Sequence, residues 1–386
     1  MKSKINSQVR FFNLLLSVII FVSFIFGNTF YAQAADDGVV VTPTHYFNVL
    51  NYPFTNSQGT SYTITSMGGI CAELSGKELY VLKGKAILVS NDTETNQLAA
   101  LYYYPDITKG NSGVKKILFR KKLLGHANAM AIDKTFIYVT TWPTNKLSNG
   151  QTQIVRISRK AIREWNESTH VTSPSATSPN GTTLFGYMNI YNNSDGSQYT
   201  KTIKSIAGYK YNSSTQKIKS FIINYGDEAN GKIPYTTAEI SSATTKTIYV
   251  MNDNNHIFKV NNPYTNGINN NGYIHTVQDI GYNATYGLYI PIYLKPSNNS
   301  SGQHNRILRL SNAKLNTTGD ARQNLSADTK LKVDNSSLDQ YEVESIAFTN
   351  KTINGTTGLK MLLSVNRYSS TNSSIKDDVQ YTTTLS

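Results

Sequence analysis

The sequence predicts an all-β fold, a β-propeller of five or six blades with three or four mostly antiparallel strands each. The first observation is a recurring unit, in which a small or polar residue precedes Ile or Met, a turn follows, and an aliphatic-Tyr-Val strand comes next. The second is composition, because Tyr, Thr, Ile and Val favour strands and the turns between them are rich in Asn, Gly, Ser and Asp. The third is a shortage of helical patterns, since the one convincing helical candidate is the short segment 160–165.

The recurring units give the expected order of the blades. They begin at Ile70, Met130, Ile206, Ile240, Ile280 and Ile346. The spacings are 60, 76, 34, 40 and 66 residues, and the 34-residue step is too short for a four-stranded blade. Either the blades are very unequal, or one of the two units there is a long outer hairpin. We expect a strand within 42–65 to pair with the C-terminal blade, because ring closure removes exposed edges. An irregular β-sandwich and a β-solenoid are the alternative folds.

The N-terminal 34 residues have the pattern of a secretory signal peptide. A basic segment with Lys2, Lys4 and Arg10 precedes an apolar stretch over 14–26, and Ala-Gln-Ala at 32–34 supplies a small-x-small cleavage site. The alternative is an uncleaved anchor, but this apolar stretch is shorter than the roughly 20 residues of a membrane span. We therefore expect a secreted protein, associated with the cell wall or free, with no membrane span after cleavage.

The remaining residues, 35–386, are expected to form a single propeller domain. Long surface loops are predicted near 166–183 and 295–304, where Ser, Pro, Asn and Gly lack periodicity. Cys71 is the single cysteine, so no intramolecular disulfide is expected, and its apolar surroundings indicate a small buried hydrophobe.

The charge balance favours anionic partners. The net charge is +13, and removal of the signal peptide leaves 34 Lys and Arg against 24 Asp and Glu. The summed field of a basic protein attracts polyanions, so an envelope glycopolymer or another surface polyanion is the expected partner. The basic residues are scattered, and no specific nucleic-acid site is predicted.

Polar positions at the start of each unit predict where a central site would lie. The first strand of a propeller blade lines the central channel, so these positions converge although they are far apart in sequence. The candidate ligand-binding or channel residues are His126, Asn128, Lys204, Glu239, Asp279, Glu342 and Glu344.

Three interpretations of these channel residues remain open. A water-filled channel needs a polar lining whatever its function. Glu239, Asp279 and Glu344 could instead hold a divalent cation such as calcium, which binds carboxylate and amide oxygens, although no cofactor is required. A carboxylate pair with a raised pKa could also act in hydrolysis. No nucleophile elbow, phosphate-binding loop or paired-cysteine motif is present, and we expect a protein that is not an enzyme, without assigning catalytic residues.

The 26 tyrosines are a second functional signal. Several lie in turns or at strand ends, including Tyr209, Tyr211 and Tyr282. Tyrosine offers flat apolar area with a polar tip, which suits contacts with sugars or protein surfaces.

Two strings carry a resemblance to a known family. The segment Tyr-Glu-Val-Glu-Ser-Ile at 341–346, followed by a loop and the strand 359–365, resembles the C-terminal part of the helveticin J-like bacteriocins. Lys-Ser-Ile at 204–206 and the Tyr-Val strands are similar to other blades of that group. The group shares its propeller with teichoic-acid-associated proteins and phage receptor-binding heads. This resemblance implies a cell-surface-facing propeller that binds envelope glycopolymers, and bacteriocin-like antibacterial action is a further expectation. The string Gly-His-Ala-Asn at 125–128 is similar to strings of secreted Gram-positive propellers.

The leading hypothesis is therefore a secreted propeller that binds a cell-surface glycan or wall polymer. A metal-dependent hydrolase or lactonase with a channel site is the first alternative. A protein-binding scaffold is the second, because a propeller face needs no chemistry to bind a partner. The sequence leaves the oligomeric state undetermined.

Overall fold

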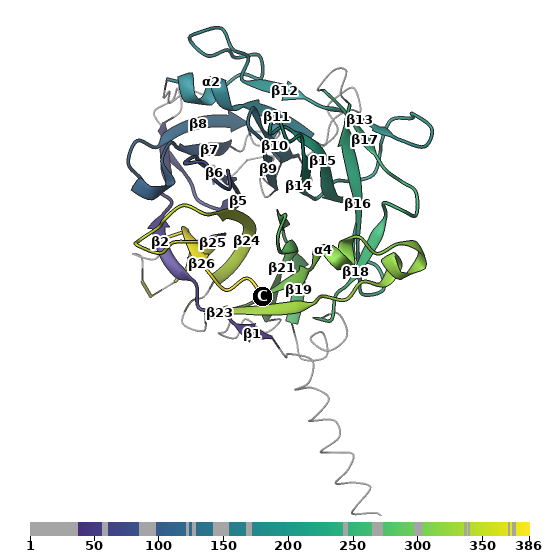
Figure 1. The fold of residues 1–386 in the computed structure, drawn as a ribbon. Coiled ribbons are helices and arrows are strands. Elements are labelled where there is room, and N and C mark those ends of the chain that lie inside the picture. Colours follow the sequence, from purple (N-terminus) through teal and green to yellow (C-terminus); the bar gives the residue numbers. More distant parts are fainter. Residues whose placement is uncertain are drawn as a thin grey trace, which may run out of the picture.

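The computed structural model is a ring of five β-sheets around a central axis (Figure 1). It describes residues 38–55, 61–84, 98–120, 123–125, 129–141, 154–166, 172–241, 246–264, 273–296, 303–335, 338, 340–369, 371–372 and 376–386. The expected signal peptide lies outside these residues, as does most of the predicted loop near 295–304. The β-propeller prediction is confirmed, with five blades rather than six.

The first two blades are regular four-stranded antiparallel sheets. The strands of blade 1, from the axis outward, are β5 (Met67–Ala72), β6 (Leu79–Lys83), β7 (Leu98–Tyr104) and β8 (Lys115–Arg120). Those of blade 2 are β9 (Met130–Ile132), β10 (Phe136–Thr140), β11 (Ile154–Ser158) and β12 (Phe185–Tyr187).

Blades 3 and 4 carry additional strands. Blade 3 consists of β14 (Ser205–Tyr211), β15 (Ile218–Asn224), β16 (Lys232–Ile240) and β17 (Thr247–Val250), with β13 (Asn189–Asn192) and β18 (Phe258–Asn261) added. Blade 4 consists of β19 (Tyr273–Val277), β20 (Gly281–Asn283), β21 (Gly287–Pro296), β22 (Gln303–Leu310) and β23 (Thr329–Asn335), with β1 (Val39–Val40) at its edge.

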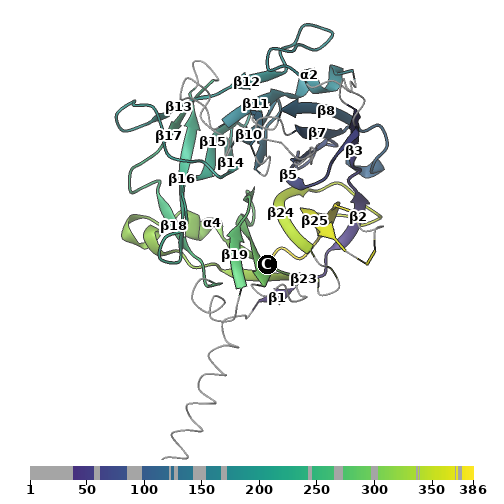
Figure 2. The same cartoon turned by 180° about the vertical axis from the view of Figure 1, so that it is seen from behind.

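Blade 5 closes the ring. It consists of β24 (Gln340–Thr349), β25 (Lys360–Tyr368), β26 (Asp378–Thr382) and the N-terminal β2 (Thr44–Asn48). The antiparallel pairing of β2 with β26 confirms the predicted closure between the two ends of the chain. Figure 2 shows β2 on the outer side of the blade that contains β24 and β25. A separate hairpin joins β3 (Tyr52–Thr55) to β4 (Ser61–Ile64).

Helices are few and short. The predicted helix is α2 (Arg159–Glu164), which begins where Ser158 Oγ accepts a hydrogen bond from Ala161 N at 3.3 Å. The other helices among the described residues are α4 (Asn312–Leu315) and two 3₁₀ turns, Ile107–Lys109 and Gly319–Asn324. None of the helices in the described ranges is both long and apolar enough to span a membrane. In the predicted loop near 166–183, the described residues 172–183 contain no named helix or strand.

The unit predicted to begin at Ile240 is wrong as a blade start. Glu239 and Ile240 end β16, the third strand of blade 3, and they pair with β17. The two units at 206 and 240 therefore belong to one blade with a long outer hairpin, which is one of the two alternatives drawn from the 34-residue step. The inner strands of the five blades start near Ile70, Met130, Ile206, Ile280 and Ile346.

Five hydrophobic clusters hold the ring together, one between each pair of neighbouring blades. The Ile or Met of each unit packs toward the preceding blade, as Met130 does against blade 1 and Ile346 against blade 4. The next residue faces the following blade, and there it is always small: Cys71, Ala131, Ala207, Gly281 and Ala347. Blades converge toward the axis, so close packing leaves little volume for the side chain of this residue.

Gly281 shows the constraint most clearly. A Cβ atom built there would lie 2.7 Å from Ile346 Cγ2 and 3.0 Å from Ile346 O, on the neighbouring inner strand. We therefore expect Gly281→Ala to lower the free energy of unfolding by about 1–3 kcal/mol, the usual cost of overpacking a core, as measured by urea denaturation. The matched control is Gly226→Ala, whose Cβ would lie 3.6 Å from Pro234 Cγ, an ordinary contact. Equal losses in the two variants would contradict this interpretation.

Candidate functional site

The central channel contains two cavities of different chemistry. We call them the polar cavity, of about 510 Å³, and the apolar cavity, of about 490 Å³. Each of the inner strands β14 and β24 passes from one to the other: Ser205 and Glu342 line the polar cavity, whereas Ala207 and Ile346 line the apolar one. The polar residues that begin the units therefore gather at one end of the channel, and the residues that follow Ile or Met gather at the other.

Asp279 lies between the two cavities and links the blades. Its Oδ2 accepts hydrogen bonds from Met130 N at 3.2 Å and from Ser345 Oγ at 2.7 Å, and its Oδ1 lies 3.5 Å from Ile206 N. Ser345 Oγ in turn accepts a hydrogen bond from Ile70 N at 3.2 Å. The carboxyl group of Asp279 thus connects its own blade 4 with blades 2, 3 and 5 directly, and with blade 1 through Ser345.

Burial controls the protonation of Asp279. The side chain is 2% exposed, and this desolvation raises its pKa to about 8, although hydrogen bonds from Ser345 and from backbone N–H groups act in the opposite direction. At neutral pH the carboxyl group is therefore largely protonated. Its position and its contacts identify it as a structural link between blades.

Two glutamates of β24 line the polar cavity. Glu344 is 6% exposed and accepts a hydrogen bond from Asn366 Nδ2, and Asn366 Oδ1 accepts one from Met67 N. Burial first, and then the neighbouring charge of Glu342, raise the pKa of Glu344 well above its usual range.

The other polar groups of the cavity are arranged around these glutamates. Gln278 Nε2 donates to Glu342 Oε1 at 2.5 Å, and Lys204 Nζ forms an ion pair with Asp227. Ser205 also lines the cavity, is 2% exposed, and its hydroxyl has no hydrogen-bond partner within the part of the chain that the structure describes.

The structure brings together four of the seven predicted site residues. Lys204, Asp279, Glu342 and Glu344 line the polar cavity. Glu239 does not, because it is exposed on the outer strand β16 and pairs with Tyr249. His126 and Asn128 lie outside the described residues.

The predicted metal set is not assembled. Glu239 is on an outer strand, away from the cavity lined by Asp279 and Glu344. Across the described ranges, no group of three or more His, Cys, Asp or Glu side chains is placed to hold a metal ion. The expectation of a divalent cation at these three residues therefore lacks its geometric basis at Glu239.

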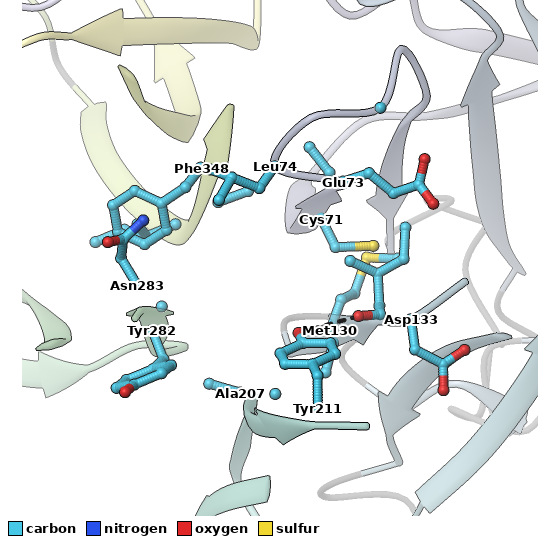
Figure 3. A pocket seen from close by; sticks show the side chains of 18 of the residues that line it. Cys71, Glu73, Leu74, Met130, Asp133, Ala207, Tyr211, Tyr282, Asn283 and Phe348 are labelled. Atoms are coloured by element: carbon cyan, nitrogen blue, oxygen red, sulfur yellow. Dashed lines mark hydrogen bonds between the residues drawn. The ribbon is translucent and has the colours of Figure 1, made fainter. Parts of the chain in front are cut away.

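The apolar cavity was not predicted as a site (Figure 3). It is lined by the small residues and the Ile or Met residues of the inner strands, such as Cys71, Met130 and Ala207. Burial raises the pKa of the Cys71 thiol, so this residue acts as a packed hydrophobe, as expected. Around this lining stand Tyr211, Tyr282 and Phe348, and Figure 3 shows these rings on different sides of the cavity.

Tyr211 is fixed in place by its hydroxyl group. The register of β14 against β15 shifts between Gly208 and Tyr211, and such a bulge re-aims a side chain. Tyr211 Oη donates a hydrogen bond to Ile132 O at 3.2 Å, while the residue remains 43% exposed. A Cβ atom at position 208 would lie 2.3 Å from this hydroxyl oxygen, so glycine there leaves room for the tyrosine.

Tyr282 is anchored in the same manner from blade 4. Its hydroxyl donates to Asn312 Oδ1 at 2.9 Å, and its ring packs edge-to-face against Tyr209, with centroids 5.0 Å apart. Burial raises the pKa of Tyr282 to about 12, so the phenol stays protonated and remains a donor. The two anchored tyrosines give the apolar cavity aromatic surfaces whose positions are set before any ligand arrives.

Polar groups complete the rim of the apolar cavity. Asn283 Oδ1 accepts hydrogen bonds from Thr285 N and Tyr286 N, and its Nδ2 donates to no acceptor among the described residues. Glu73 forms an ion pair with the fully buried Arg159, at 2.5 Å between Oε1 and Nη1. The sequence identified Tyr209, Tyr211 and Tyr282 as candidates for sugar contacts, but tyrosine content alone could not place Tyr211 and Tyr282 at one cavity.

Comparisons with known proteins add no family. No family model matches the chain, and no curated protein matches it. Solved structures that align with it include a Trypanosoma rangeli sialidase in complex with sialic acid, at 9% identity and a TM-score of 0.33, over 84% of this chain and 49% of that one. Another is a Bombyx mori GH32 beta-fructofuranosidase in complex with sucrose, at 5% identity and a TM-score of 0.34, over 88% of this chain and 61% of that one. The chain thus spans 49% and 61% of the lengths of these proteins, and the likeness concerns the fold alone.

The raised pKa of Asp279 predicts a stability that falls with increasing pH. The folded state keeps the proton up to about pH 8, whereas the unfolded chain releases it near pH 4. The contribution of this proton to stability is therefore complete below pH 4 and is lost as the pH rises toward 8.

The matched comparison is Asp279→Asn, which cannot titrate at this position. Relative to this variant, the free energy of unfolding of the wild type should fall by roughly 1 kcal/mol per pH unit in this window, as measured by urea unfolding at several pH values. Glu344 titrates in both proteins, so most of its contribution is common to the two curves. Parallel stability curves for the two proteins would contradict the prediction.

Proposed function

We propose that this protein is a secreted propeller that binds glycans, and that the apolar cavity accepts one sugar ring of a cell-envelope glycopolymer. The observation that carries the proposal is the pair of anchored aromatic rings, Tyr211 and Tyr282, contributed by neighbouring blades to one cavity of about 490 Å³. The C–H face of a pyranose packs on such rings, and rigid aromatic side chains lose little entropy on binding.

Polar groups at the rim supply the hydrogen bonds that orient a sugar. Asn283 Nδ2 is an available donor, and Glu73 Oε atoms can accept from hydroxyl groups while Arg159 holds the carboxylate in place. The carboxylate of Asp133 already accepts hydrogen bonds from Thr135 N and Phe136 N. Because the acidic residues Glu73 and Asp133 both line this cavity, it favours a sugar ring that carries no negative charge. The net charge of +13 favours a polymer that has anionic groups elsewhere along its chain.

Secretion and antibacterial action belong to the proposal on other grounds. The N-terminal pattern of 1–34 supports export, and the resemblance of 341–346 to helveticin J-like bacteriocins supports action on other cells. Growth inhibition of Gram-positive indicator cells by the purified protein tests the second statement, separately from binding.

Substitution of the aromatic rings tests the binding site. Tyr282→Ala and Tyr211→Ala should each weaken binding to purified cell walls by roughly tenfold, because each removes a stacking surface worth about 1.4 kcal/mol. Tyr282→Phe is the matched control: it keeps the ring, loses the hydrogen bond to Asn312, and should bind within about threefold of the wild type. The measurement is depletion of the protein from solution by walls prepared with and without teichoic acid.

Two results would reject this assignment. One is equal binding of the alanine variants and the wild type, provided that all proteins unfold at similar temperatures. The other is failure of the wild type to bind either wall preparation.

A further inference from the structure

The polar cavity at the other end of the channel has features that the proposed glycan site does not use. It gathers the carboxyl groups of Asp227, Glu228, Glu342 and Glu344, against one lysine, Lys204. Lys204 is paired with Asp227, so the cavity keeps an excess of negative charge. At about 510 Å³ it is larger than a single ion requires.

A buried hydroxyl that has no partner among the described residues lies in the wall of this cavity. Ser205 is buried, and no group among the described residues makes a hydrogen bond with its Oγ. Buried polar atoms without partners are rare in native proteins, because each carries a desolvation penalty. The equivalent residues of blades 4 and 5, Asp279 and Ser345, use their side chains to link blades, whereas Ser205 does not.

We propose that the polar cavity binds a primary ammonium group on a small polyhydroxy compound, held by Glu342, Glu344 and the Ser205 hydroxyl. An ammonium group is a donor of three hydrogen bonds with one positive charge, and the cavity supplies acceptors and negative charge. Gln278 beside Glu342, and Asn224 in the wall, supply amides for the hydroxyl groups of the same compound.

Binding of such a cation is coupled to the proton on Glu344. The acidic groups near this carboxyl are Glu342 on its own strand, Asp279 from blade 4, and Asp377 before β26, which is paired with Lys83. Tyr293 of β21 and Asn366 of β25 complete its surroundings. Because burial and these carboxylates raise the pKa of Glu344, its proton persists to higher pH than that of an exposed glutamate. An arriving ammonium favours the carboxylate form, so Glu344 releases its proton to the solvent as the ligand binds.

The test compares glucosamine with N-acetylglucosamine by isothermal titration calorimetry on the mature, full-length protein at pH 6. The two sugars differ in the charge of one nitrogen. We expect glucosamine to bind at least tenfold more tightly, with an affinity that falls as salt is added, and with proton release that appears as a dependence of the heat on buffer ionisation enthalpy. The proton release should disappear in Glu344→Gln.

Ser205→Ala keeps the proposal falsifiable if the glutamate variants fail to fold. The hydroxyl has no partner in the described fold, so its removal should leave the melting temperature unchanged or higher. The same change should weaken glucosamine binding by roughly tenfold, the usual effect of one hydrogen bond to a charged group. The preference for glucosamine over N-acetylglucosamine should persist in Tyr282→Ala, which removes a ring of the other cavity, and Ser205→Ala should leave cell-wall binding unchanged, so failure of one proposal is distinguishable from failure of the other.

Four outcomes would overturn the inference. They are equal affinity for the two sugars, glucosamine binding without proton release, glucosamine binding that is unaffected by Ser205→Ala, and calcium binding that is tighter than glucosamine binding and displaces it. The last outcome would assign the cavity to a metal ion.

Discussion

The five blades depend on one carboxyl group near the axis. The blades approach one another most closely there, and the backbone N–H groups of Met130 and Ile206 find their partner in Asp279, while that of Ile70 finds it in Ser345. Without these acceptors the inner strands would bury polar groups at a cost of roughly 1–3 kcal/mol each. Closure by β2 and β26 fixes the ring at its circumference, and Asp279 fixes it at its centre.

The same convergence separates the channel into two chemical environments. On one side of Asp279, the position after each Ile or Met must be small, because a larger side chain would meet the next inner strand, as the space around Gly281 shows. These small residues leave an apolar hollow that Tyr211 and Tyr282 border. On the other side, longer polar residues such as Lys204 and Glu342 line the cavity. The two cavities thus differ in the residues that line them, and this difference underlies the two ligands proposed above.

The sequence predicted the architecture and part of the polar cavity, because the repeat in register places Lys204, Asp279, Glu342 and Glu344 near one axis. It misplaced Glu239, because the β16–β17 hairpin imitates the strand pattern of a blade start. Two signals in the sequence argue against a blade start at Ile240. Without it, the starts of successive units are separated by 60, 76, 74 and 66 residues, which is nearly even. In addition, Ile240 is followed by the polar Ser241 rather than by a small apolar residue. The anchoring of Tyr211 and Tyr282 could not be predicted, because it depends on partners such as Ile132 and Asn312 that only the assembled ring brings near.

The residue before each Ile or Met shows how structural and functional demands are divided in this ring. These residues are Gly69, Ala129, Ser205, Asp279 and Ser345. Gly69 and Ala129 offer no polar side chain, and Asp279 and Ser345 use theirs to link the blades, which leaves Ser205 as the remaining polar residue of the five. Ser205 carries a hydroxyl that has no hydrogen-bond partner in the described fold. A buried polar atom that stabilises nothing in the free protein costs free energy, and a ligand that hydrogen-bonds to it would offset that cost.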